Sequence, residues 1–275
     1  MTHQGSRVKK AAINSTVAII GQIVSIICSF ILPRLILTHF GSAYNGITSS
    51  ISQFIECVVL LRAGVGSVTR AALYKPLAEG NNEEISGIIN ATQAFMKKIS
   101  LTFLALLFLI ACIYQFAISD EFDWLFSFSL VLILGISTFA QNYFGITYQM
   151  LIQADQKNYV YSLISLITTI LNTLIAVVLI LAGANIHIVK IGSAFAFSLN
   201  PILLNIYVRK TYCLDKTIPA NTSAISQRWD AFAQQVAAFV NNNTDLVVLT
   251  MFSNLKEISV YTVYYMIANK IKTLV

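Results

Sequence analysis

The sequence predicts an all-α, polytopic bundle of about eight transmembrane helices. Its 275 residues are 56% hydrophobic and 11% charged, whereas soluble domains carry about 25% charged residues. Apolar segments also recur along nearly the whole chain. A spanning helix needs roughly 20 such residues, because the hydrocarbon core is ~30 Å thick and each residue rises ~1.5 Å. The composition therefore excludes an ordinary water-soluble domain.

Eight apolar segments carry this prediction. They lie at 11–37, 43–68, 97–118, 124–151, 159–183, 187–208, 229–252 and 257–275. The first is too long for the apolar region of a signal peptide, which has roughly 7–15 residues, so we expect it to be retained. None shows the alternation of barrel strands, and helices are the other structure that satisfies its backbone within lipid.

The loops predict the orientation, because cytoplasmic loops of membrane proteins are enriched in lysine and arginine. One side would carry Arg7, Lys9, Lys10, Arg70, Lys75, Lys97, Lys98, Lys157, Arg209, Lys210, Lys216 and Arg228, and the other only Arg34, Lys190 and Lys256. We therefore expect a cytoplasmic N-terminus. This distribution also explains the net charge of +6 without a nucleic-acid partner. Residues 82–97, with isoleucines at helical spacing, predict a short amphipathic helix on the cytoplasmic surface.

No pattern of a metal, cofactor or catalytic site occurs in the sequence. Its four cysteines are widely spaced and its three histidines are isolated, so neither a disulfide framework nor a metal-ligand set is predicted. The short motifs of hydrolases and metalloproteases are also missing. We therefore expect no cofactor, no metal and no enzymatic activity.

Polar residues within the apolar segments are the candidate functional residues, since each is costly in a membrane unless it faces a partner or a wet cavity. In the second segment Asn45, Ser49, Gln53 and Glu56 share one helical face. Other candidates are Arg34 in the first segment, Arg62 in the second, Gln141 and Asn142 in the fourth, and Asn241 and Asp245 in the seventh. Serine and threonine alone would more often join helices by hydrogen bonds.

Several motifs of residues 32–81 occur together in one known family. They are Phe40-Gly41, Tyr44-Asn45-Gly46, Gly64-Val65-Gly66, residues 73–78 (LYKPLA) and Gly80-Asn81. With them the chain resembles Wzx-type polysaccharide-biosynthesis flippases of the multidrug, oligosaccharidyl-lipid and polysaccharide exporter superfamily. Beyond residue 100 the resemblance depends mainly on the spacing of the segments.

The resemblance implies a fold of two six-helix bundles around a central cavity. Residues 1–210 would form the first bundle, residues 211–228 a cytoplasmic linker, and residues 229–275 the first two helices of an incomplete second bundle. The chain would therefore be a partial sequence of the first half of an exporter. It would lie in the cytoplasmic membrane of a bacterium as a multi-pass protein.

The resemblance also implies a function. Such proteins move a polyprenyl-diphosphate-linked oligosaccharide from the inner to the outer leaflet by alternating access, for cell-surface polysaccharide. From residue chemistry and depth, we expect Arg34 and Arg62 to bind the diphosphate, because guanidinium groups bind phosphate in a bidentate fork. Asn45, Gln53, Gln141, Asn142 and Asn241 would contact the sugar, and Glu56 or Asp245 would bind a coupling Na⁺ or H⁺. A polysaccharide polymerase or a glycosyltransferase would be its protein partner.

Three other functions fit parts of the sequence. A multidrug or cation exporter would use Glu56 and Asp245 but has no use for Arg34 and Arg62. A membrane enzyme of polysaccharide assembly would usually need longer loops than those near 69–96 and 209–228. A membrane scaffold would have polar faces that satisfy one another and leave no cavity.

Overall fold

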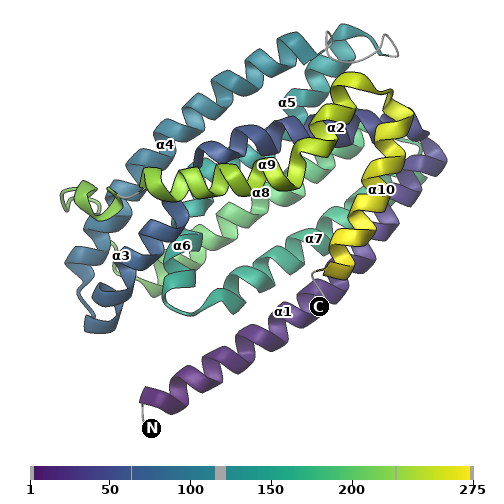
Figure 1. Ribbon diagram of the computed structural model, residues 1–275. Helices are drawn as coiled ribbons and strands as arrows, with labels where there is room; N and C mark the ends of the chain where they lie inside the picture. The colour runs from purple at the N-terminus through teal and green to yellow at the C-terminus, as the bar shows by residue number, and fades with distance from the viewer. Residues whose placement is uncertain (1–2, 63, 115–121, 227, 273–275) are drawn as a thin grey trace.

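The computed structural model describes residues 3–62, 64–114, 122–226 and 228–272. These residues form helices and connecting turns and include no strand, so the all-α prediction is confirmed (Figure 1). In chain order the helices are α1 (His3–His39), α2 (Ser42–Val59), η1 (Leu60–Arg62), α3 (Val65–Glu79), α4 (Asn82–Ile113), α5 (Trp124–Ala140), η3 (Gln141–Gly145), α6 (Ile146–Ala154), α7 (Asn158–Leu181), α8 (Ile186–Thr211), η4 (Thr222–Ile225), α9 (Arg228–Phe252) and α10 (Leu255–Lys272).

Local sequence explains several helix boundaries. Asn81 caps α4 by accepting a hydrogen bond from the Glu84 amide at 3.1 Å, and Asn185 caps α8 in the same way. Side-chain oxygens at this position satisfy amides that have no partner inside the helix. Gly80 adopts a left-handed conformation after α3, with φ 69°, which costs glycine little and ends many helices.

Five helical segments are long and apolar enough to cross a membrane. Within the described residues they are Lys10–His39, Asn82–Ile113, Trp124–Ala154, Asn158–Leu181 and Ile186–Thr211. The chain thus has the helices of a membrane protein, while the count of eight stays a prediction. The other three segments of the prediction correspond to α2 with α3, α9 and α10, which lie alongside these five. α2 carries many polar residues and ends at η1.

The helices lie side by side with their connections at two ends of the bundle (Figure 1). The turns α3–α4 and α6–α7 lie at the end where the chain begins, which we call the N-terminal end. The α1–α2 and α9–α10 turns lie at the opposite end. α7 packs between α1 and α8, and α2 contacts both α9 and α10. α2 therefore has neighbours from both the first and the last parts of the chain.

The separate amphipathic helix expected at residues 82–97 is not observed. These residues form the first half of the continuous helix α4. Ile85, Ile88 and Ile89 are buried in a core cluster with residues of α3, α6, α7 and α8. The isoleucine spacing predicts the helical conformation correctly, but the apolar face packs against other helices of the protein instead of lying on a membrane surface.

The segment between α8 and α9 is attached to α4. The Asn90 side chain donates hydrogen bonds to the carbonyls of Asp215 and Ile218, at 3.0 and 2.9 Å. The amide of Asn221 donates to the carbonyl of Gly87 at 3.0 Å. The described part of the expected linker is thus held against α3 and α4.

Candidate functional site

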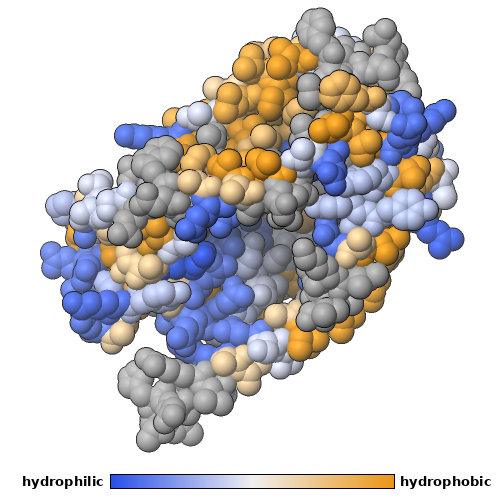
Figure 2. Space-filling view, in the orientation of Figure 1, coloured by the Kyte–Doolittle hydropathy of each residue, from blue (hydrophilic) through white to orange (hydrophobic). Residues whose placement is uncertain are grey.

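A polar hollow opens between α9 on one side and α1 with α7 on the other. Figure 2 shows hydrophilic side chains lining it, whereas hydrophobic side chains cover the visible surface of α4 and α5. Figures 1 and 2 share one orientation, and together they place α3 and α6 beside the hollow, toward the N-terminal end. Polar groups gathered inside an apolar bundle are typical of a binding site or a pathway.

Two arginines lie on one wall of this region. The chain breaks between α2 and α3 at η1, where Arg62 lies, and positions 66 and 70 then share one face of α3. Arg62, Gly66 and Arg70 line a cavity of about 140 Å³ together with Gln149 and Gln153 of α6. We shall call it the arginine cavity.

Neutral amides hold both guanidinium groups. Arg62 Nη1 donates to Asn142 Oδ1 at 2.7 Å, and Arg70 Nη1 donates to Gln153 Oε1 at 3.1 Å. Neither arginine forms an ion pair with a carboxylate in the described part of the chain. Glu56 is within electrostatic range of Arg62 but is not paired with it. The arginine cavity therefore keeps positive charge and free N–H donors, which suits an anionic ligand.

A π-helical turn positions Asn142. It covers Gln141–Gly145 and separates α5 from α6, and such turns are frequent at functional sites. Gly145 allows the close approach of α8 there, because a Cβ at this position would lie 2.8 Å from Pro201 Cβ. Asn142 is buried with 1% of its surface exposed, whereas Gln141 is partly exposed and does not line the arginine cavity.

A second polar cavity lies toward the opposite end. It has a volume of about 350 Å³ between α1, α2, α8 and α10, and we shall call it the α2 cavity. Its polar lining consists of Asn45, Thr48, Ser49, Ser52, Gln53, Glu56, Lys190 and Thr262. All four residues of the predicted polar face of α2 thus line one cavity. The Gln53 side chain is buried, and its Nε2 has no hydrogen-bond partner among the residues that the structure describes.

Two predicted site residues, Arg34 and Asp245, lie outside both cavities. Arg34 is exposed on α1 and lines neither cavity, so the structure does not bring it together with Arg62. Asp245 is exposed on α9 and accepts a hydrogen bond from the Tyr261 hydroxyl at 3.0 Å. The side chain of Asn241 lies outside the described residues. Sequence reasoning assigned no site role to Arg70, which lies in α3 beyond the end of the second predicted segment.

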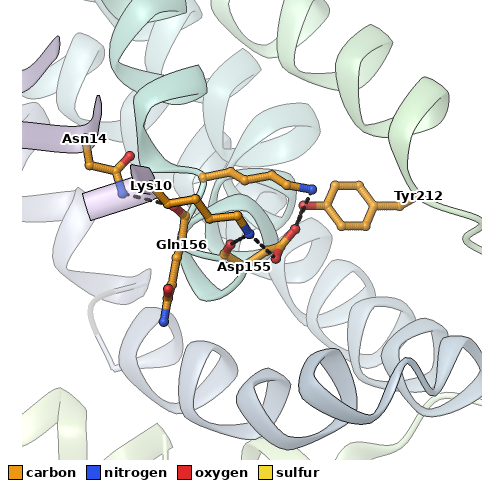
Figure 3. Close-up of polar contacts among 6 residues, drawn as sticks. Lys10, Asn14, Asp155, Gln156 and Tyr212 are labelled. Carbon is orange, nitrogen blue, oxygen red and sulfur yellow. Dashed lines mark hydrogen bonds and ion pairs between the residues drawn. The ribbon is translucent and has the colours of Figure 1, made fainter. Parts of the chain in front are cut away.

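A charged cluster at the N-terminal end was also missed (Figure 3). Asp155, in the turn between α6 and α7, is bound by Lys157 at 2.6 Å and by Lys10 of α1 at 3.5 Å. The Tyr212 hydroxyl donates at 2.6 Å to Asp155 Oδ2, the oxygen that Lys157 also binds, whereas Lys10 binds Oδ1. Asn14 of α1 donates to the Gln156 carbonyl at 2.9 Å. The cluster thereby joins α1, the α6–α7 turn and the end of α8.

The pKa values in this cluster follow from its contacts. Burial would raise the pKa of the Asp155 carboxyl, but hydrogen bonds from Lys157 and Tyr212 and the charges of Lys157 and Lys10 hold it below its ordinary value. Burial, followed by the bond to Asp155, raises the pKa of Tyr212 above its ordinary value. The tyrosine thus remains a donor and the aspartate an acceptor at neutral pH.

The comparisons with known proteins bear on the fold. No family model matches the chain, and no curated protein matches it. A solved structure described only as "protein A" has 14% sequence identity to it and a TM-score of 0.72. The match covers 96% of this chain and 61% of that one. The chain thus shares its fold with a solved protein and spans 61% of that protein's length.

Proposed function

We propose that the protein is a transporter that moves a polyprenyl-diphosphate-linked oligosaccharide from the inner to the outer leaflet of a bacterial cytoplasmic membrane. The arginine cavity carries this proposal. Arg62 and Arg70 face one cavity, and neutral amides, not carboxylates, hold them. A diphosphate supplies the missing negative charge and accepts bidentate hydrogen bonds from guanidinium groups. The resemblance to Wzx-type flippases supports the same substrate.

The orientation of the charged loops supports the direction of transport. The N-terminal end contains the larger share of lysines and arginines and would face the cytoplasm. The hollow would then open toward the leaflet in which the lipid-linked substrate is made. In this arrangement α2 with α3, α9 and α10 would also cross the membrane, giving eight passages around the hollow.

The contacts between α2 and α10 support an inward-facing state. At the opposite end, the Asn45 side chain donates a hydrogen bond to Ser259 Oγ. A Cβ on Gly46 would collide with the backbone of Leu255, so the two helices approach closely. Separation of α10 from α2 would open the α2 cavity outward. Alternating access then moves the ligand from the arginine cavity past the polar face of α2.

The membrane potential can contribute to outward transport. An inside-negative potential favours outward movement of an anion by ~2.3 kcal/mol per charge per 100 mV. Coupling to Na⁺ or H⁺ would use Glu56, which lines the α2 cavity, or the exposed Asp245. A cation exporter is less well supported, because Lys190 shares the α2 cavity with Glu56 and would repel a cationic ligand.

Transport by the complete protein in proteoliposomes tests the proposal. The assay follows translocation of a fluorescent polyprenyl diphosphate that carries an oligosaccharide. We expect Arg62→Gln and Arg70→Gln each to reduce transport strongly, and Arg209→Gln to leave it intact. Arg209 is the matched control because it is an exposed arginine in the last turn of α8.

Two results would contradict the proposal. One is undiminished transport by a folded Arg62→Gln, Arg70→Gln double variant. The other is a wild type that fails to translocate the lipid but exports a cationic dye, with export abolished by Glu56→Gln or Asp245→Asn. The second result would identify a drug or cation exporter.

A further inference from the structure

A hydroxyl-rich groove lies between α1 and α7. It has a volume of about 280 Å³. Its polar lining consists of Gln22 and Ser25 of α1 with Tyr161, Ser162, Ser165 and Thr169 of α7, and its other lining residues are small or aliphatic. No charged side chain lines the groove. Its chemistry therefore differs from that of both the arginine cavity and the α2 cavity.

Helical spacing shows that the groove faces away from the apolar surface of the bundle. On α7 the lining positions 162, 165, 166 and 169 follow one another at spacings of three, one and three and share one face. The exposed apolar residues Leu163, Ile167, Ile170, Leu174 and Val178 follow the same spacing on the opposite face. On α1 the exposed Ile20, Ile23 and Ile27 likewise lie opposite the lining positions 18, 21, 22 and 25. Both helices thus turn their polar faces toward the groove.

The arginine cavity is lined by α6 and the groove by α7, and these two helices contact each other. Tyr161, which lines the groove, is within electrostatic range of the Arg62 guanidinium. Arg62 lines the arginine cavity from the side of α2 and α3. A ligand whose charged part is bound at Arg62 would therefore have its adjacent part close to Tyr161.

Several hydroxyl groups of the groove are available to a ligand. Within the described residues, Ser162, Ser165 and Thr169 form no side-chain hydrogen bond. Serines and threonines that only join helices would be bonded to a neighbouring helix or to their own backbone. Here the two helices leave an open space instead. Each hydroxyl can both donate and accept, which matches the hydroxyl groups of a sugar.

We propose that the groove between α1 and α7 binds the uncharged glycan portion of a lipid-linked ligand whose diphosphate is held by Arg62 and Arg70. This inference rests on the proposed function and adds to it the site that distinguishes one glycan from another. The ring of Tyr161 offers a flat apolar surface to the carbon face of a sugar ring. The serine and threonine hydroxyls of the groove then bind the hydroxyl groups at the edge of the sugar. Binding of the diphosphate by the arginines gives the protein affinity for all lipids of this class. Contacts in the groove then determine which glycan it prefers.

Two lipids separate the roles of the two sites. One is a polyprenyl diphosphate that carries a neutral trisaccharide, and the other is the same lipid without sugar. The complete protein is tested for binding and translocation of each as wild type, as Ser162→Ala/Ser165→Ala, and as Ser165→Leu, which fills the groove. The control is Ser29→Ala/Thr38→Ala, since both hydroxyls bond to carbonyls of their own helix α1 outside the groove. Thermal unfolding shows that each variant folds.

We expect the serine-to-alanine double variant to bind the glycosylated lipid roughly tenfold more weakly, the effect of two lost hydrogen bonds. Its binding of the sugar-free lipid should be unchanged. The glycan site is overturned if the variants lose equal affinity for both lipids, or if neither groove variant loses affinity for the glycosylated lipid. In either case, transport by the wild type would still support the proposed function. A wild type that binds neither lipid overturns both.

Discussion

The Asn45 side chain of α2 donates a hydrogen bond to Ser259 Oγ of α10 at 2.9 Å, across 214 residues of sequence. Both residues are buried. One residue further along α2, Gly46 lies against the backbone of Leu255, where α10 begins. These contacts hold the last helix of the chain against the second at the end of the bundle opposite the N-terminus.

Gly46→Ala should weaken this contact. Its Cβ would collide with the Leu255 carbonyl, and a backbone group cannot rotate away as a side chain can. Overpacking of this kind costs ~1–3 kcal/mol, so we expect a lower midpoint of thermal unfolding in detergent. Gly21→Ala is the control, because a Cβ there meets nothing within 4 Å. Equal stability of the two variants would show that α10 does not pack on α2 in this way.

Asp155→Asn should destabilise the N-terminal end of the bundle. The substitution removes the carboxylate that Lys10, Lys157 and Tyr212 share. We expect a loss of ~1–2 kcal/mol, the range of a charge-assisted hydrogen bond after allowance for solvent screening. Thermal unfolding of the variant measures it. Asp215→Asn is the control, since the Asp215 side chain bonds only within its own turn, to Thr217.

The effect of Asp155→Asn should depend on pH. The folded state holds the pKa of Asp155 below its ordinary value, which is ~3.9 for aspartate. The unfolded chain therefore takes up the proton first as the pH falls. The extra stability of the wild type is present at pH 7 and is lost as the pH falls below about 4. A difference in unfolding midpoint that stays constant from pH 7 to pH 3 would contradict this assignment.

The sequence predicted the helices well because their apolar stretches are long and continuous. The ends of α7 and α8 lie within a few residues of the predicted 159–183 and 187–208. It failed at 82–97, where the isoleucine spacing is the same whether the face packs on lipid or on protein. It also ended the second segment at 68, which assigned Arg70 to a loop, although α3 continues to Glu79.

The candidate site was only partly predictable for a related reason. Helical spacing brings Asn45, Ser49, Gln53 and Glu56 to one face, and this local relationship holds in the α2 cavity. Whether Arg34 lies near Arg62 depends on how α1 packs against α2, which spacing within one helix does not specify. The bond of Arg62 to Asn142 depends in the same way on packing, and on a π-helical turn that no local pattern predicts.

Neutralising the arginines without removing them should abolish binding while preserving the fold. Asn142→Asp and Gln153→Glu each place a carboxylate at an oxygen that already accepts a hydrogen bond from Arg62 or Arg70. The new carboxylates would form ion pairs with the guanidinium groups, which would then no longer be available to the diphosphate. We expect KM for the diphosphate lipid to rise at least about tenfold, with unchanged or higher thermal stability. Gln156→Glu, at an exposed turn position, should change neither value. If Asn142→Asp and Gln153→Glu both leave KM at the wild-type value, the arginines do not bind the diphosphate.

Glu56 and Lys190 should compensate each other in the α2 cavity. Both line it and form no ion pair within the described residues, so a coupling between their charges would have to act across the cavity. Glu56→Gln leaves the positive charge of Lys190 without this coupling, and Lys190→Gln leaves the negative charge of Glu56 without it. We expect each single variant to lose at most ~1 kcal/mol of stability, because Glu56 is exposed to solvent and exposed charges interact weakly. The double variant should lose less than the sum, with a coupling of ~0.5–1 kcal/mol in a double-mutant cycle. Strictly additive losses would mean that the two charges act independently, and Glu56 would then remain free to bind a coupling cation.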